Sequence, residues 1–300
     1  MSTSPLVSVL TATHNGAAFV AETLDSVLAQ TYPSVEHVVV DDGSTDVTPD
    51  VLRAYAERHP ERITVVERSD TAGPTRRRNE ALGAASGTYF AWLDHDDVWL
   101  PTKLERQVDV LERDRDVGFV YTQWELFDHE SGRVLERSRI RPGGDTLSRL
   151  FVEGCFVASS TVLWRRDAME RRALRFRDAH FSWGDDHFLW LGLALDSGGE
   201  LVNEVLTRLR RHGENESVRL ARENPYPSSI ELLDEFLRSF PEARSRIGDA
   251  RRRGIAHHHA LAAIYELQHH RRAKAAAYAL RAAARDPSGA LRYVRGRLAR

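Results

Sequence analysis

Four short apolar runs alternate with segments of helical periodicity over roughly the first hundred residues, and this alternation limits the fold more than any other feature. Val, Ile and aromatic residues dominate the runs, as in buried strands. The runs cover 6–10, 35–40, 63–66 and 89–93. Strands that alternate with helices need crossover connections, so the sequence predicts an α/β fold with a mostly parallel sheet flanked by helices.

The composition is that of a folded protein without membrane spans. The 300 residues are 42% hydrophobic and 29% charged, which excludes wholesale disorder. No apolar run approaches the roughly 18–20 residues of a transmembrane helix, and the N-terminus lacks the pattern of a signal peptide. Cys155 is the only cysteine, so an internal disulfide and a thiolate zinc site are excluded. We therefore predict a cytoplasmic location.

Polar clusters follow three of the four predicted strands. They cover 13–16, 41–46 and 94–97. Ligands of such sheets bind outside the carboxyl ends of the strands, so the three clusters are expected to line one crevice. Helix capping remains an alternative explanation for single members such as Ser44 and Asp46.

The last cluster contains three carboxylates, which capping does not explain because one would suffice. Like charges this close require a cation or raised pKa values, so we predict Mg²⁺ or Mn²⁺ near Asp94, Asp96 and Asp97. The chain has no glycine-rich phosphate loop, which leaves phosphate to the metal and to arginines. Among 76–78, we expect one arginine to face the crevice and two to be solvated.

These motifs, taken together, resemble the family 2 glycosyltransferases of the GT-A fold. The resemblance rests on Asp-Asp-Gly-Ser-Thr-Asp at 41–46, Arg78-Asn79, and Asp-His-Asp-Asp at 94–97, in this order. The first and third motifs each follow a predicted strand, and Arg78-Asn79 lies on a predicted helix. It covers about residues 5 to 215. It implies an enzyme that moves a sugar, with inversion, from a nucleoside-diphosphate sugar to an acceptor hydroxyl.

The resemblance also implies how the donor nucleotide binds. Asp42 would receive the base or ribose, Ala12, His14 and Asn15 would line the nucleoside pocket, and Arg78 would contact the nucleotide. The family more often has proline and tyrosine at the positions of Ala12 and His14, so UDP-, GDP- and dTDP-linked donors all remain open.

Metal and diphosphate residues are implied in the same way. Asp96 would be the direct ligand of the metal, and Asp94 would be shared between metal and ribose. His212 could complete the metal shell or contact the diphosphate, and Arg211 could contact the diphosphate. A metal ion would offset the charge that grows on the leaving diphosphate.

A carboxylate is needed to take the proton of the acceptor hydroxyl. The segment Trp183-Gly184-Asp185-Asp186 resembles the family's Gly-Glu-Asp segment at a helix start. Asp186 is our choice for the catalytic base, with Asp185 as the reserve. Stabilisation of a helix N-terminus explains one of the two equally well.

The C-terminal part differs in character, so we expect a glycosyltransferase domain at 1–222 and a basic helical region at 223–300. The nucleotide half would cover about 1–100 and the acceptor half about 101–222. From Arg244 to Arg300 the net charge is 14 − 3 = +11. Side chains of neighbours on a helix diverge, so His257, His258 and His259 are expected to be solvated rather than to bind metal.

The basic region has several candidate partners. Its last basic residues, 292–297, could lie on the inner face of an anionic cell membrane, which would fit a lipid-linked acceptor. The basic region could instead pack on the rest of this chain, or on a second subunit in a homodimer. No motif supports nucleic acid binding.

Two other functions remain open. Leu93 to Val98 also satisfies the motif of haloacid-dehalogenase-like phosphatases, in which Asp94 would be a nucleophile. A non-catalytic protein that binds sugar nucleotides or glycans is the second. The glycan itself, whether cell-surface polysaccharide or glycolipid, is not identified by the sequence.

Overall fold

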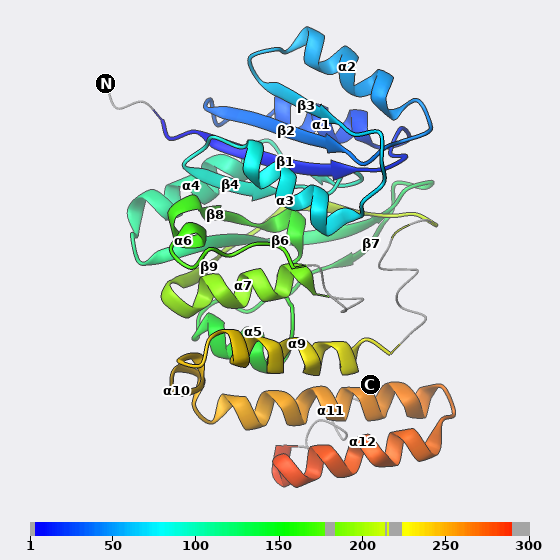
Figure 1. Cartoon of the computed structure of the whole chain (residues 1–300), viewed down its shortest axis with the longest axis vertical. Helices are drawn as coiled ribbons and strands as arrows, with labels where there is room; N and C mark the ends of the chain where they lie inside the picture. The colour runs from blue at the N-terminus through cyan, green and yellow to red at the C-terminus, as the bar shows by residue number, and fades with distance from the viewer. Residues whose placement is uncertain (1–3, 178–183, 214, 216–223, 290–300) are drawn as a thin grey trace. The chain divides into compact units, whose positions relative to one another are not determined.

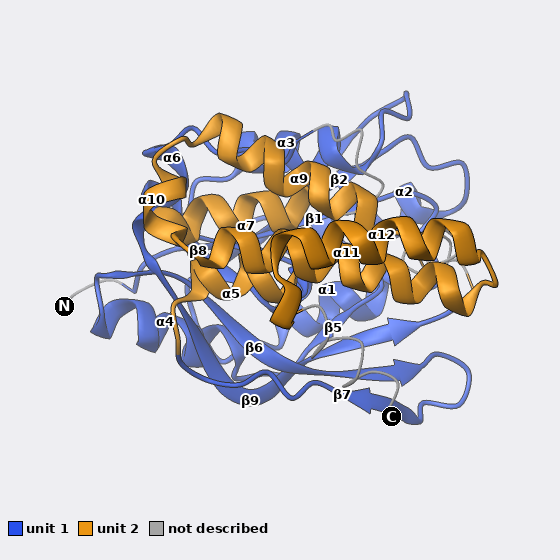
Figure 2. Cartoon of the chain, turned by 90° about the horizontal axis from the view of Figure 1, so that it is seen from below, with its two compact units in different colours: residues 1–143, 157–178, 196–212 blue, residues 144–156, 179–195, 213–300 orange. Residues whose placement is uncertain are grey.

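The computed structural model describes residues 4–177, 184–213, 215 and 224–289. The chain forms two compact units (Figure 2). Unit 1 contains residues 1–143, 157–178 and 196–212, and unit 2 contains residues 144–156, 179–195 and 213–300. Two segments that precede residue 222, 144–156 and 179–195, belong to the same unit as the C-terminal helices. The domain boundary at 222 stays a prediction.

The N-terminal half of the sheet in unit 1 is parallel, as the alternating pattern predicts. Its strands are β1 (Val7–Thr13), β2 (Val35–Asp41), β3 (Ile63–Glu67) and β4 (Tyr89–Trp92). β1 lies between β2 and β4 in parallel register, and β3 pairs with β2 (Figure 1). The loops after β1, β2 and β4 therefore leave the same edge of the sheet.

The rest of the sheet is mixed. Its order is β3-β2-β1-β4-β8-β6-β9-β5, with β7 on β6. The added strands are β5 (Val98–Trp99), β6 (Val117–Asp128), β7 (Val134–Arg137), β8 (Leu163–Arg165) and β9 (Gly198–Arg211). β8 is antiparallel to both β4 and β6, whereas β6 and β9 are parallel. This arrangement brings the end of β9 toward the loop between β4 and β5, because β5 pairs with β9.

Helices of unit 1 cover the sheet and bury its apolar side chains. They are α1 (Val20–Leu28), α2 (Thr48–Arg58), α3 (Pro74–Ala84), α4 (Lys103–Arg113) and α6 (Arg166–Glu170), with the short 3-10 helix η1 (Ser159–Thr161). Val20 and Leu24 of α1 pack with Val39 of β2 and Leu52 of α2 in one apolar cluster. A rigid sheet edge is thereby fixed beneath the polar loops.

Unit 2 is helical. It contains α5 (Thr146–Glu153), α7 (Asp185–Asp196), α9 (Tyr226–Ser239), α10 (Ala243–Ile247), α11 (Ala250–Gln268) and α12 (Arg272–Arg285). α11 packs against α5, α9 and α12 (Figure 1), and α11 and α12 form a helical hairpin. In the described part of the chain, no helix has the length and apolar character needed to cross a bilayer.

The expectation that the three consecutive histidines are solvated was wrong for two of them. His258 is 2% exposed and His259 is 5% exposed. α11 is contacted by helices on more than one side, so diverging side chains are buried against different neighbours. Helical spacing predicts that neighbouring side chains point apart. It does not predict how many sides of the helix are covered by other helices.

Candidate active site

Asn15 joins the loops that follow β1 and β2. Its side-chain oxygen accepts a hydrogen bond from Thr45 N (2.8 Å), and its own N–H donates to Ser44 Oγ (2.8 Å). The residue has a left-handed backbone, with φ 51°, which asparagine tolerates better than most residues. Asn15 therefore shapes this edge of the sheet; a contact with nucleotide stays a prediction.

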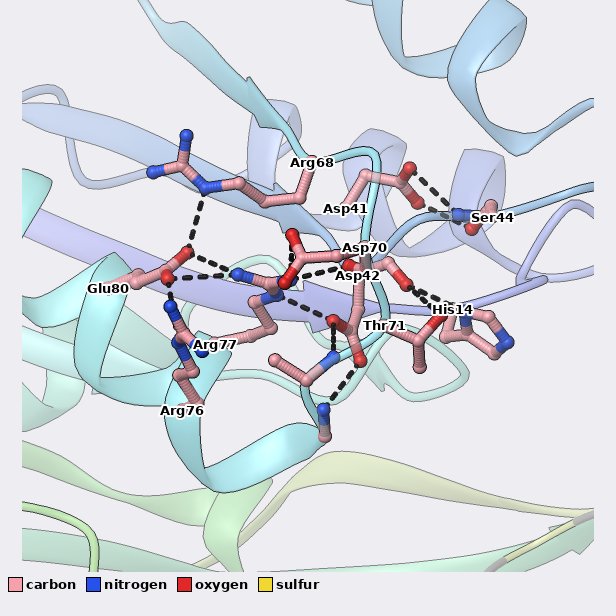
Figure 3. Close-up of polar contacts among 12 residues, drawn as sticks. His14, Asp41, Asp42, Ser44, Arg68, Asp70, Thr71, Arg76, Arg77 and Glu80 are labelled. Carbon is pink, nitrogen blue, oxygen red and sulfur yellow. Dashed lines mark hydrogen bonds and ion pairs between the residues drawn. The ribbon is translucent and has the colours of Figure 1, made fainter.

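The Asp42 carboxylate, predicted to receive the nucleoside, already has three donors from the chain. It accepts from Ala72 N (2.7 Å), Gly73 N (2.9 Å) and Arg77 Nε (2.5 Å) (Figure 3). The Asp42 backbone oxygen contacts His14 Nδ1 at 2.9 Å. Asp42 is thus held in one orientation at the crevice.

Ala12 and His14 were both assigned to the nucleoside pocket. Ala12 is half-buried in β1, paired with Val40, and His14 is exposed beside the backbone oxygen of Asp42. Their contact with a nucleoside stays a prediction.

Arg77 is the arginine that holds this region together, and the sequence analysis missed it. Its side chain is 1% exposed and donates to Asp42, to Asp70 (3.0 Å) and to Glu80 (2.9 Å) (Figure 3). Burial would lower its pKa, but the hydrogen bonds to the three carboxylates outweigh burial and raise it. The expectation of two solvated arginines was wrong, because only Arg76 is exposed, with 62% of its side chain accessible.

Arg78, the predicted nucleotide contact, lies beside Asp94 of the acidic loop. Its guanidinium lies 5.0 Å from the ring centre of Trp92 and 5.5 Å from that of Phe176. Its Nη2 is 3.5 Å from Asp94 Oδ1, which also accepts from Trp92 Nε1 (2.7 Å). The arginine and the first carboxylate of the Asp-x-Asp pair are therefore neighbours, held on an aromatic base.

Asp96 and His212 meet, as the metal hypothesis requires. His212 Nε2 lies 2.9 Å from Asp96 Oδ2. Burial would raise the pKa of Asp96, but the hydrogen bond from His212 and the charges of His95 and His212 lower it. An imidazole nitrogen and a carboxylate oxygen that lie this close together are both atoms that a divalent ion could bind.

The described residues hold no preformed group of three or more His, Cys, Asp or Glu side chains for a metal. Asp94 has 36% of its side chain exposed, and its oxygen is engaged by Trp92. Among the described residues, Asp96 and His212 are the pair that could hold a metal ion, with Asp94 beside them.

Asp97 and Ser160 form the inner part of the acidic cluster. Burial, followed by the charges of Asp96 and Asp94, raises the pKa of Asp97 well above its usual range. Ser160 Oγ donates to Asp97 Oδ2 (2.6 Å) and accepts from Asp94 N (3.1 Å). Ser160 comes from η1, far along the sequence, so no local motif could have identified it.

Arg210, rather than Arg211, is built into the acidic loop. Its N–H donates to Asp97 Oδ1 (3.0 Å), its Nε to the Asp96 backbone oxygen (2.8 Å) and its Nη2 to Glu22 (2.5 Å). It is 6% exposed, whereas Arg211 is exposed. Arg210 fixes the end of β9 two residues before His212, and the diphosphate role of Arg211 stays a prediction.

The two candidate bases begin α7 in unit 2. Asp186 N donates to Asp185 Oδ1 (2.9 Å), and His187 N donates to Asp186 Oδ1 (2.7 Å). Both side chains are half-buried after Gly184, whose φ is 104°. Helix-start carboxylates and an accessible base are both compatible with this. Trp183 of the same motif and the basic run 292–297 lie outside the described residues.

Lys103 bears on the phosphatase alternative, for which a lysine that binds phosphate is expected after the Asp-x-Asp motif. It is fully buried and donates to Gln107 Oε1 (2.6 Å). Burial lowers its pKa well below the usual range. It therefore cannot bind a substrate phosphate, and Lys274 on α12 of unit 2 is the only other lysine.

A protein-family model matches most of unit 1. The model of glycosyl transferase family 2 matches residues 8–172, which is more than half of the chain.

Similar proteins agree with this match. The glucosyltransferase WfgD of Escherichia coli, named as acting from UDP-Glc on α-D-GlcNAc-diphosphoundecaprenol, is 28% identical over 66% of this chain and 73% of its own. An uncharacterized glycosyltransferase of Rickettsia typhi is 28% identical over 70% of this chain, and the match spans 65% of that relative. Somewhat less than two thirds of the longer protein is therefore represented.

A solved structure is similar over nearly the whole chain. The mannosyltransferase PcManGT of Pyrobaculum calidifontis, in complex with GDP-Man and Mn²⁺, has a TM-score of 0.65 and 25% identity over 99% of this chain and 81% of its own. This agreement supports the fold that the strand pattern predicts.

Proposed function

Because this chain belongs to glycosyltransferase family 2, with the GT-A fold, we propose that it transfers a sugar from a nucleoside-diphosphate sugar to an acceptor hydroxyl with inversion. One observation carries the proposal. β1 pairs in parallel with both β2 and β4, so the Asp42 loop and the Asp94–Asp97 loop leave the same edge of one sheet. A nucleotide and its diphosphate need these two groups of side chains together.

The donor would lie along this edge. Asp42 presents a fixed carboxylate to the nucleoside, with Ala12, His14 and Asn15 beside it. Arg78 would contact the nucleotide near Asp94. PcManGT in complex with GDP-Man and WfgD with UDP-Glc support a nucleotide-sugar donor; UDP, GDP and dTDP remain to be distinguished.

Asp96 and His212 would hold Mn²⁺ or Mg²⁺, with Asp94 at its edge. When bound, the ion offsets negative charge on the departing diphosphate. Arg210 keeps His212 and the acidic loop in place through its bonds to Asp96 and Asp97. Arg211 would reach the diphosphate from the exposed side of the same strand.

Asp186 would take the proton from the acceptor hydroxyl, with Asp185 as the alternative. A single displacement assisted by one base inverts the configuration of the transferred carbon. The diphosphoundecaprenol acceptor in the name of WfgD supports a glycan or lipid-linked acceptor and a role in glycan synthesis.

Nucleotide binding is expected to stabilise the protein only when metal is present. A ligand at about 100 times its dissociation constant adds roughly 2.7 kcal/mol, enough to raise the midpoint of thermal unfolding by several degrees. We would measure the midpoint with UDP, GDP and dTDP, each with and without Mn²⁺. One nucleotide is expected to give a shift that requires Mn²⁺ and is lost in Asp96→Asn.

Asp50→Asn is the matched control, because Asp50 is exposed on α2 and has 71% of its side chain accessible. The control should keep the full shift. A chain that shows no shift with any nucleotide, or that releases phosphate from a phosphomonoester, would contradict the transferase proposal.

Removal of the base is expected to separate binding from reaction. General base catalysis contributes typically about 10²–10⁴-fold, so Asp186→Asn should lose most of its sugar transfer while it keeps the nucleotide-dependent thermal shift. Asp185→Asn, the neighbouring isosteric change, should lose far less. The reverse order of the two variants in a donor-consumption assay would reassign the base to Asp185.

A further inference from the structure

α12 has almost no buried surface, although it is a regular helix of 14 residues. Only Ala275 and Ala282 are buried, and Ala282 packs on Ala260 of α11. Most helical stability in proteins comes from packing of an apolar face. A helix attached along so narrow a seam leaves the rest of its surface open to a partner.

The charge on this open surface has one sign. α12 carries Arg272, Lys274, Arg281 and Arg285 and no acidic residue. All four are exposed, and within the part of the chain that the structure describes none of them forms an ion pair with a carboxylate. The nearby Arg271, in contrast, is paired with Glu266. Among the described residues of unit 2, the cations of α12 therefore have no carboxylate in direct contact, and Lys274 acts on Glu266 only at longer range.

The basic residues lie on either side of an outward apolar strip. At 100° per residue, the strip opposite the buried seam contains Leu280, and Leu280 is 72% exposed. Lys274, Arg281 and Arg285 lie along one side of this strip and Arg272 along the other. An exposed leucine between cations is typical of helices that lie in the plane of a membrane surface.

We propose that the outer face of α12 docks on the surface of an anionic phospholipid bilayer. The cations would contact lipid phosphates, while Leu280 and the neighbouring alanines would enter the boundary between headgroups and acyl chains. Each basic residue near an anionic leaflet strengthens partitioning by about fivefold. The inference concerns α12 alone and does not depend on the transfer reaction.

The chemistry of the face favours a bilayer over nucleic acid. Binding of single strands without a recognition motif uses exposed aromatic rings on which bases stack. The only aromatic residue of α12, Tyr278, is half-buried on the seam side and lies next to His259, with ring centres 6.1 Å apart. The open face presents cations, which bind lipid phosphates, and the exposed Leu280, which can enter the apolar part of a bilayer.

Sedimentation with vesicles tests the proposal. The full chain would be mixed at low salt with phosphatidylcholine vesicles or with vesicles of equal parts phosphatidylcholine and phosphatidylglycerol. We expect pelleting only with the anionic vesicles, reduced by added salt. Arg281→Glu/Arg285→Glu should weaken binding at least about tenfold, since two contacts become repulsive, and Leu280→Ser should weaken it about tenfold at constant charge.

Arg53→Glu/Arg58→Glu is the matched control, with the same change in charge on α2 of unit 1. It should bind as the unchanged chain does. The basic residues beyond 289 remain in every variant, so α12 is tested separately from them. Circular dichroism and the nucleotide-dependent thermal shift would establish that each variant is folded, and that shift tests the proposed function separately.

Three outcomes would overturn the proposal. Equal pelleting with both kinds of vesicle would show that lipid charge is not recognised. Unchanged binding of the α12 variants would place the contact elsewhere on the chain. Light scattering that shows a dimer disrupted by Leu280→Ser, without any loss of vesicle binding, would assign the face to a second copy of this chain.

Discussion

Replacement of Arg77 with methionine is expected to lower the free energy of unfolding by about 3–5 kcal/mol, the usual effect of removing one partner of a buried ion pair. Arg77 Nε lies 2.5 Å from the Asp42 carboxylate, and both residues are buried: Arg77 is 1% exposed and Asp42 is 5% exposed. Methionine fills similar volume but leaves the Asp42 carboxylate buried with only its two backbone donors. Chemical denaturation followed by tryptophan fluorescence would measure the change.

Arg76→Met provides the matched control at the preceding residue. Its side chain is 62% exposed and its one ion pair, with Glu80, is 3.5 Å long, so the same substitution should alter stability by no more than about 0.5 kcal/mol. Equal effects of the two variants would show that the buried network around Arg77 does not stabilise the fold.

A double variant separates loss of charge pairing from loss of packing. Asp42→Asn removes the carboxylate that Arg77→Met leaves unpaired, so the double variant should be more stable than the sum of the single effects predicts. Asp42 is also the proposed nucleoside contact. The stabilities of the single and double variants should therefore be measured without nucleotide, so that only folding contributes.

The strand pattern was sufficient for the parallel part of the fold and for the common edge at which the three polar loops lie. Each βα repeat is local in sequence, and the carboxyl-end rule then places the polar loops after β1, β2 and β4 together. The antiparallel strands β8 and β5 were not identified. β8 has three residues and β5 has two, so neither is long enough for a periodic pattern to emerge.

Contacts between residues of the motifs were predictable, whereas contacts made across the fold were not. Asp96 and His212 lie 2.9 Å apart, as the motif resemblance implies. Ser160 and Arg210 also contact the acidic loop. Ser160 had no local signal, and Arg210 belongs to the same arginine–histidine run as His212, in which only Arg211 and His212 were assigned a role. Arg77 was missed for a different reason: a run of three arginines predicts exposure, and only the buried Asp42 beside it reverses that expectation.

Acidification between pH 7 and 5 is expected to destabilise both units, because four histidines are buried in the neutral form. Burial lowers the pKa of His37 and of His258 to about 3, and that of His187 and of His259 to about 4. The nearby charge of Arg62 adds to the effect at His37. His37 lies in unit 1, and the other three lie in unit 2.

The sign follows from proton binding in the two states. Above the ordinary pKa of 6.5 neither state binds a proton at these rings, so they have no effect on stability. Below it the unfolded chain binds protons that the folded chain cannot accept until about pH 4 or 3. Each ring therefore lowers the free energy of unfolding by about 2 kcal/mol at pH 5, or about 8 kcal/mol for the four.

Urea denaturation at pH 7, 6 and 5 would measure this loss, which is comparable to the whole stability of many domains, about 5–15 kcal/mol. His258→Leu removes one proton site from the unfolded chain, so its loss between pH 7 and 5 should be about 2 kcal/mol smaller than that of the unchanged chain. His270→Asn is the control, because His270 is exposed and asparagine tolerates its φ of 59°. If both variants lose as much stability as the unchanged chain, the burial of His258 does not govern the response to acid.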